Sequence, residues 1–141
     1  MSEFTIRYTV DGEFDETVDA TIDALGEEGF GILCDIDVQA TLKEKLDEDF
    51  RKYRILGACN PPLAHEAMSE EIELGALLPC NVVVYERDDG AVGVSAVDPG
   101  VMLSVVGNPD LDPVADEVAD RMSTAIERLP GATEAAASAD D

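Results

Sequence analysis

Positively charged residues are scarce in this sequence of 141 residues. Lys and Arg together number 9 and Asp and Glu number 32, which gives a formal net charge of −23 at pH 7. Binding to nucleic acid phosphates needs a basic surface, and so does attraction to an anionic membrane. The composition therefore argues against nucleic acid and against a membrane surface as partners.

Lysine is scarcer still, because only Lys43, Lys45 and Lys52 occur. The acidic residues are spread along the whole chain instead of forming one tail. An acidic, lysine-poor surface resembles that of haloarchaeal-type proteins, which work in molar salt. Salt at about 1 M shortens the Debye length to about 3 Å, so the repulsion between these acids is largely screened. We therefore expect a halophilic protein; an acidic protein from dilute salt is the alternative.

Cysteines are few and odd in number: Cys34, Cys59 and Cys80. An odd count argues against a secreted disulfide framework. No apolar run approaches the ~18 residues of a membrane-spanning helix. The first ten residues, MSEFTIRYTV, lack the basic and apolar regions of a signal peptide. These absences predict a cytoplasmic protein whose thiols stay reduced.

The chain is nevertheless rich enough in apolar residues to fold. Hydrophobic residues make up 45% of it, which argues against overall disorder despite the high charge. The length is typical of one domain. We predict a single α+β domain over residues 1–129. Residues 130–141 lack large apolar side chains, which predicts a disordered acidic tail.

The spacing of apolar residues predicts alternating strands and helices. Strict alternation indicates a strand, and apolar residues three or four apart indicate a helix. The expected strands cover residues 4–10, 30–38, 53–59, 81–86 and 91–97, and the expected helices 14–25, 39–47, 61–77 and 113–129. Alternation in the second strand places Cys34 on its buried face. The predicted order is β-α-β-(short α)-β-α-β-β-α.

Two segments carry a family resemblance: RILGACNPPLAH at residues 54–65 and LLPCN at residues 77–81. Through them the chain resembles the domain-of-unknown-function family numbered 302. The resemblance implies a two-layer sandwich, in which helices back a curved, mainly antiparallel sheet like that of the TATA-binding protein. It also implies a homodimer. It implies no biochemical activity.

Cys59, His65 and Cys80 form the first candidate site. Cys59 directly precedes a helix N-terminus, where positive partial charge favours a thiolate. In the antiparallel sheet that the resemblance implies, Cys59 and Cys80 lie at one rim, provided that the helical stretch between them breaks near Ser69 or Gly75. Cys59 would then be the nucleophile, Cys80 would resolve or share the adduct, and His65 would assist proton transfer.

The same three residues also allow two other interpretations. They could hold Zn²⁺ or another soft metal, although C-x5-H-x14-C is no standard zinc spacing and a fourth ligand is missing. Alternatively, both cysteines pack as small buried hydrophobic residues, and His65 lies on the helix surface. Because of this spacing we predict no bound metal. Cys59, His65 and Cys80 are kept only as weak candidates for metal ligands.

The polar neighbours of the cysteines form a second candidate site. Asn60 and Asn81 each follow one of the two cysteines, and with Arg54 they could line a small ligand pocket. The alternative roles are a helix cap for Asn60 and a strand-end turn for Asn81.

Two charged clusters have simpler explanations. Asp35 and Asp37 share a strand face that we expect to be exposed to solvent. Surface ion pairing is the plain account of the five clustered cations, although they could also receive a small anion. These cations are Lys43, Lys45, Arg51, Lys52 and Arg54.

The sequence contains no P-loop, dinucleotide-binding or Ser-His-Asp motif, so it identifies no cofactor and leaves open whether the protein is an enzyme. The favoured hypothesis is a small cytoplasmic protein that binds or handles a small ligand or sulfur species at the rim formed by Cys59 and Cys80. The alternatives are a dimeric structural or interaction module without catalysis, and a soft-metal (Zn or Cu) binding protein.

Overall fold

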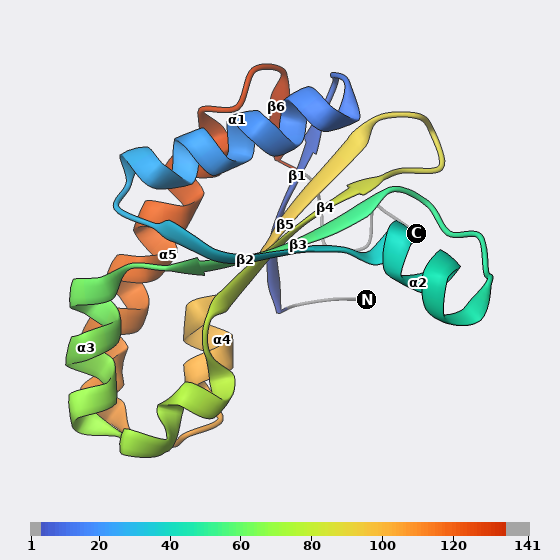
Figure 1. The fold of residues 1–141 in the computed structure, drawn as a ribbon. Coiled ribbons are helices and arrows are strands. Elements are labelled where there is room, and N and C mark those ends of the chain that lie inside the picture. Colours follow the sequence, from blue (N-terminus) through green and yellow to red (C-terminus); the bar gives the residue numbers. More distant parts are fainter. Residues whose placement is uncertain (1–3, 135–141) are drawn as a thin grey trace.

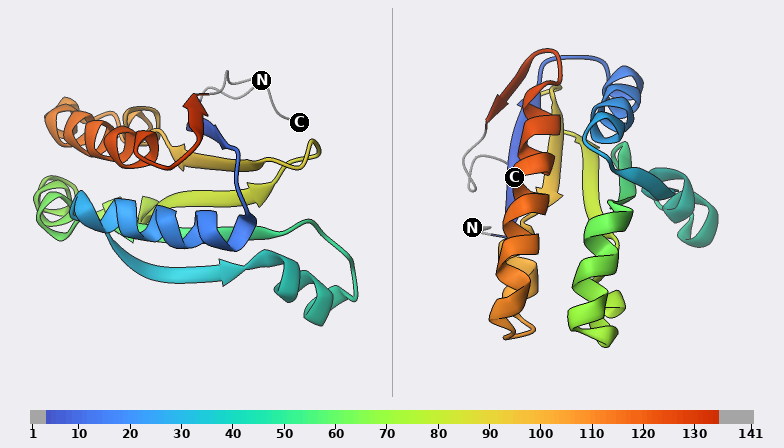
Figure 2. Two further views of the ribbon diagram at one scale, coloured as in Figure 1. Left: turned by 90° about the horizontal axis from the view of Figure 1, so that it is seen from above. Right: turned by 90° about the vertical axis from the view of Figure 1, so that its left-hand side faces the viewer.

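The fold consists of one six-stranded antiparallel sheet with helices packed mainly on one face (Figures 1 and 2). The structure is a computed structural model and describes residues 4–134. The strand order is β2-β3-β4-β5-β1-β6. The predicted α+β architecture, with an antiparallel sheet backed by helices, is confirmed.

The strands follow the predicted periodicity closely. Their bounds are Thr5–Val10 (β1), Gly31–Asp37 (β2), Tyr53–Cys59 (β3), Cys80–Glu86 (β4), Val92–Val97 (β5) and Ala132–Glu134 (β6). Strands β4 and β5 form a hairpin whose turn contains Gly90 at φ 90°. Val82, Val84, Val94 and Ala96 are fully buried beneath the helices.

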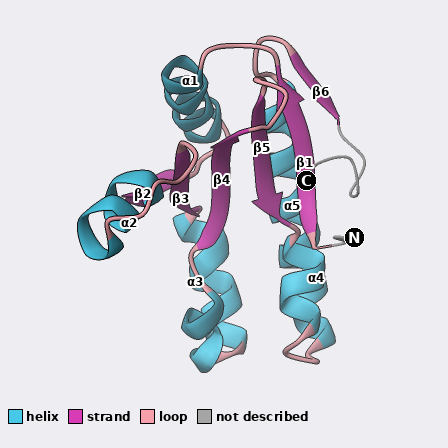
Figure 3. Cartoon of the chain, turned by 90° about the vertical axis from the view of Figure 1, so that its right-hand side faces the viewer, coloured by secondary structure: helices cyan, strands magenta, loops and turns pink. Residues whose placement is uncertain are grey.

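The helices are α1 (Phe14–Glu27), α2 (Val38–Leu46), α3 (Pro61–Glu70), α4 (Pro99–Ser104) and α5 (Asp112–Glu127), with 3₁₀ turns η1 (Ile72–Leu77) and η2 (Pro109–Leu111). Helices α1 and α5 cover one face of the sheet, α3 packs against α5 beyond the end of β3, and α2 lies beside the β2 edge. Figure 3 shows that no described helix covers the other face of β4, β5 and β1. We call this the open face.

One helical prediction needs adjustment. The long helix expected over residues 61–77 is broken at Glu71, whose backbone is extended, and so it becomes α3 followed by η1. The break falls between the two positions suggested by the sequence, Ser69 and Gly75. It lets the chain turn back toward the sheet.

The prediction that Cys34 is buried is wrong. The β2–β3 register shifts between Ile32 and Cys34, so a β-bulge places one extra residue, Leu33, in β2. A one-residue shift sends every following side chain to the opposite face. Cys34 therefore lies opposite Gly57 and is exposed.

The predicted disordered tail also begins too early. Ala132–Glu134 form strand β6 and pair with β1, and the Asp11 amide donates to the Gly131 carbonyl at 3.3 Å. Pairing at a sheet edge uses backbone groups, so it needs no large apolar side chain. The remainder of the predicted tail, residues 135–141, lies outside the described residues.

Candidate functional site

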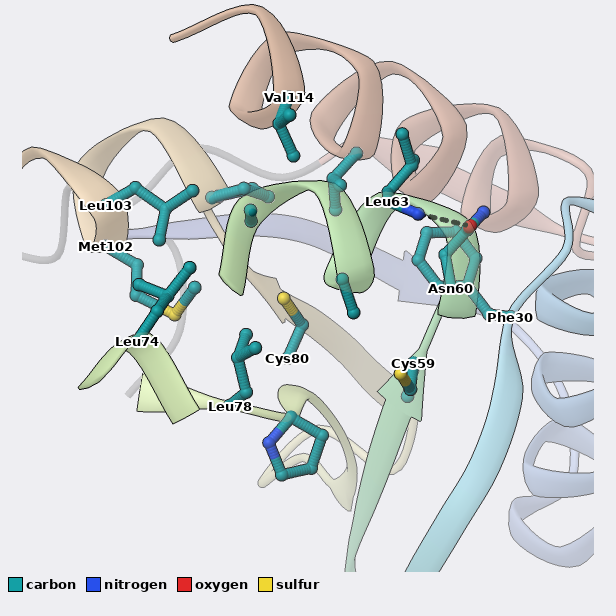
Figure 4. A pocket seen from close by; sticks show the side chains of 16 residues that line it. Phe30, Cys59, Asn60, Leu63, Leu74, Leu78, Cys80, Met102, Leu103 and Val114 are labelled. Carbon is teal, nitrogen blue, oxygen red and sulfur yellow. Dashed lines mark hydrogen bonds between the residues drawn. The ribbon is translucent and has the colours of Figure 1, made fainter. Parts of the chain in front are cut away.

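A small apolar pocket lies at the end of the sheet where β3 finishes and β4 begins (Figure 4). Its walls come from the ends of these strands and from α3, η1, α4 and α5. The lining includes Phe30, Cys59, Asn60, Leu63, Leu74, Leu78, Cys80, Met102, Leu103 and Val114. Its volume is about 40 Å³, and one water molecule needs about 10–15 Å³ of such space. The pocket therefore accepts a group of only a few heavy atoms.

Both predicted thiols line this pocket. Ala58 of β3 lies opposite Cys80 of β4, so antiparallel pairing brings Cys59 and Cys80 to the same end of the sheet. The intervening chain leaves as α3 and returns as η1, because the break at Glu71 reverses its direction. The predicted proximity of the two cysteines is thus present in the structure.

The two thiols have different surroundings. Cys80 is only 8% exposed, and burial, followed by the charge of nearby Cys59, raises its pKa to about 11. Burial in an apolar wall penalises the thiolate. Cys80 therefore remains a thiol at neutral pH, which opposes the resolving role expected for it. Cys59 is partly exposed and is the more accessible of the two.

Asn60 lines the pocket and caps α3. Its side-chain oxygen accepts a hydrogen bond from the Leu63 amide at 3.3 Å, as Figure 4 shows. The cap occupies this acceptor, so the structural role predicted for Asn60 is present. Gly29 packs against the same side chain: a Cβ there would lie 3.0 Å from the Asn60 amide nitrogen.

The other predicted polar residues lie elsewhere. His65 is exposed on α3 and does not line the pocket, so the Cys-His-Cys set is not assembled. Asn81 is exposed and lines a groove on the open face. Arg54 points to the other end of β3 and binds Asp35 through hydrogen bonds of 2.7 and 2.5 Å. Sequence spacing placed these residues near the cysteines but did not fix the direction of their side chains.

The charged residues of the two clusters singled out in the sequence form ion pairs and a helix cap. The Arg54 guanidinium lowers the pKa of the Asp35 carboxyl through its hydrogen bonds. Asp37 caps α2 by accepting from the Ala40 amide at 2.9 Å. Lys43 pairs with Asp47 and Asp49, and Arg51 pairs with Asp88.

Within residues 4–134, no group of three or more His, Cys, Asp or Glu side chains is arranged to hold a metal ion. The weak metal candidates Cys59 and Cys80 therefore lack the third ligand that the sequence suggested in His65. Over the same residues, no helix is long and apolar enough to span a membrane.

Most of the pocket wall comes from residues that the sequence did not single out as site candidates. Leu74 comes from η1, Met102 and Leu103 from α4, and Val114 and Val118 from α5. The helical spacing of Val114 and Val118 did predict that they face inward. It carried no signal that their neighbours would be residues forty or more positions earlier in the chain.

Comparisons with known proteins agree with this architecture. Residues 6–129 match the family model described as "Domain of unknown function DUF302". The chain is also similar to the crystal structure of an uncharacterised conserved DUF302 protein from Bacillus stearothermophilus, at 29% sequence identity and a TM-score of 0.84. That match covers 91% of this chain and 99% of the other. None of the curated proteins compared with the sequence matches it.

Proposed function

The chain belongs to the DUF302 family, whose description names no activity, and we propose on the basis of the pocket that it carries a small sulfur species on Cys59. The observation that carries this proposal is that two thiols line one small apolar pocket at the rim of the sheet. A fold can host many unrelated functions, so the function of this protein follows from the chemistry of this site.

The two thiols would have unequal roles. Cys59 is partly exposed and follows the sheet directly into the N-terminus of α3, so it is the side chain that a donor can reach. Cys80 is held protonated by burial. As a neutral thiol it forms part of the wall and is a weak hydrogen-bond donor to a neighbouring sulfur.

The reaction that fits this arrangement is transfer of a sulfane sulfur. The Cys59 thiolate attacks the terminal sulfur of a persulfide donor, RSSH. A new S–S bond forms at Cys59, the S–S bond of the donor breaks, and the donor leaves as the thiol RSH. The products are the Cys59 persulfide and RSH, with no net oxidation. The pocket has room for the transferred atom and excludes the body of the donor.

The test uses a Cys34→Ala background, because Cys34 is exposed and would react with any donor. Protein is mixed with glutathione persulfide, desalted and weighed by intact-mass spectrometry. We expect a gain of one sulfur atom, its loss in Cys59→Ala, and its retention in Cys80→Ala. Peptide mapping assigns the modified residue.

Two results would contradict the proposal. One is equal labelling of Cys59→Ala, which would show that Cys59 is not the acceptor. The other is no labelling of the background protein, which would favour the competing interpretation that both cysteines only pack. Denatured protein serves as the control, since its thiols are accessible regardless of the fold.

A further inference from the structure

The open face of the sheet carries no acidic residue along its four central strands. The strand register places Thr5, Arg7 and Thr9 of β1 opposite Val97, Ser95 and Gly93 of β5 on this face. The corresponding positions of β3 and β4 are Tyr53, Ile55, Gly57, Asn81, Val83 and Tyr85. In a chain with 32 Asp and Glu residues, this gap in the negative surface identifies a face that an anion can approach.

A groove of about 340 Å³ runs across this face. Its lining is Phe4, Thr5, Arg7, Tyr53, Asn81, Val83, Tyr85, Ser95 and Val97. Apolar and aromatic walls with a few polar groups are the usual composition of a small-molecule site. Tyr53 and Tyr85 stack with ring centroids 5.9 Å apart, so this part of the wall is flat and aromatic.

One polar group in the groove lacks a partner. The hydroxyl of Thr5 is buried without a hydrogen bond among the described residues. A buried hydroxyl normally has a partner, because leaving it unsatisfied costs free energy. The Thr5 hydroxyl is therefore a hydrogen-bonding group that the described part of the protein leaves unused.

The charge of the groove defines the chemistry of that molecule. Among the described residues that line the groove, Arg7 is the one charged side chain. A guanidinium has five N–H donors in a planar fork, so Arg7 can bind a carboxylate in addition to its contacts within the protein. Thr5, Ser95 and Asn81 supply further hydrogen-bonding groups.

We propose that the open-face groove binds a small aromatic carboxylate. Its carboxylate lies on Arg7 and the Thr5 hydroxyl, and its ring lies against Tyr53 and Tyr85. This site is separate from the cysteine pocket, and its test does not depend on thiol chemistry.

The experiment compares three probes by amide NMR titration of the full chain in molar KCl. Benzoate combines ring and charge, benzamide keeps the ring without charge, and acetate keeps the charge without the ring. We expect benzoate to perturb the amides of Thr5, Arg7, Asn81 and Ser95. Its affinity should exceed that of either other probe by about tenfold or more, the difference that one charge-assisted hydrogen bond makes.

Three variants locate the site. Arg7→Gln should reduce benzoate affinity to that of benzamide, whereas Arg121→Gln, on the helical side, should leave it unchanged. Thr5→Val removes a hydroxyl without a partner, so it should raise the unfolding midpoint of the free protein while weakening benzoate binding. This last variant keeps the proposal testable if Arg7→Gln folds poorly.

The proposal is overturned if benzoate binds no better than benzamide or acetate, or if Arg7→Gln or Thr5→Val binds it as tightly as the native chain. It is also overturned if the amide shifts of this face change with protein concentration and benzoate does not compete. That result would mean that a second copy of the chain covers the face.

Discussion

The three cysteines differ in solvent exposure, and we expect their thiol reactivity to differ for that reason. Cys34 is exposed beside the β2 bulge, Cys59 is partly exposed at the end of β3, and Cys80 is buried at the start of β4. Thiol reactivity follows the thiolate fraction and access. Both factors suppress Cys80, since burial raises its pKa and closes its approach.

Alkylation should therefore separate the three thiols. We expect iodoacetamide to modify Cys34 first and Cys59 more slowly, with Cys80 reacting in the folded protein only as the pH approaches 11. The ordinary pKa of a cysteine thiol is 9.0. Because the pKa of Cys80 is raised in the folded protein, its thiol stays protonated, and therefore unreactive, at pH values above 9.0. A pH series of alkylation rates on Cys34→Ser/Cys59→Ser measures this directly. A midpoint near 9 would contradict it, and the same variant in urea is the control.

At the scale of elements, the β2 bulge and Gly57 depend on each other. The bulge turns Cys34 toward β3, where a Cβ on Gly57 would lie 2.6 Å from the Cys34 sulfur and 2.9 Å from Cγ of Pro79. Only a residue without a Cβ leaves room for both neighbours. Gly57 is therefore required by close approach, at a position where the backbone is an ordinary strand.

Gly57→Ala should destabilise the fold by about 1–3 kcal/mol, the usual cost of overpacking. The Cys34→Ala substitution removes the sulfur atom nearest to the new Cβ and should relieve part of the overpacking. The loss of stability caused by Gly57→Ala should therefore be smaller in the Cys34→Ala background. Urea unfolding of the four proteins in this double-mutant cycle gives the coupling.

Gly26→Ala is the matched control, because no atom lies within 4 Å of a Cβ there and Ala favours helices by about 1 kcal/mol over Gly. Equal costs of Gly57→Ala in both backgrounds would show that Cys34 does not cause the strain.

Most of the acidic residues in the described part of the chain lie on helices and loops. Arg residues partly offset their negative charge through surface pairs such as Arg128 with Glu28 at 2.8 Å and Arg121 with Glu117 at 2.7 Å. Exposed pairs of this kind contribute little individually. Repulsion among the remaining acids therefore opposes folding in dilute salt and is screened in concentrated salt.

We expect the urea midpoint to rise steeply between dilute and molar KCl. Asp116 and Asp120 are exposed on α5, so the double variant Asp116→Asn/Asp120→Asn should show a weaker salt dependence with a higher midpoint in dilute salt. A midpoint that does not change with KCl would remove the halophilic interpretation. Sucrose in place of KCl controls for effects of cosolvent exclusion that do not involve charge.

Much of the fold was predictable because it depends on short-range interactions. Apolar periodicity located β1, α1, β3 and α5 to within a few residues, and the Asn60 cap followed from the grammar of a helix start. The antiparallel pairing that placed Cys59 near Cys80 came from the family resemblance. No local pattern specified the bulge at Leu33 or the strand β6, because each depends on pairing with another part of the chain.

The sequence by itself determined the charge and the order of the elements from β1 to α5, since these depend on composition and on neighbours a few positions apart. Only the tertiary structure decided that His65, Asn81 and Arg54 point away from the cysteines. It alone also decided how deeply Cys80 is buried and which open-face residues gather around Arg7. The reason is physical: burial and side-chain direction arise from packing between distant segments, and a one-residue change of register reverses them.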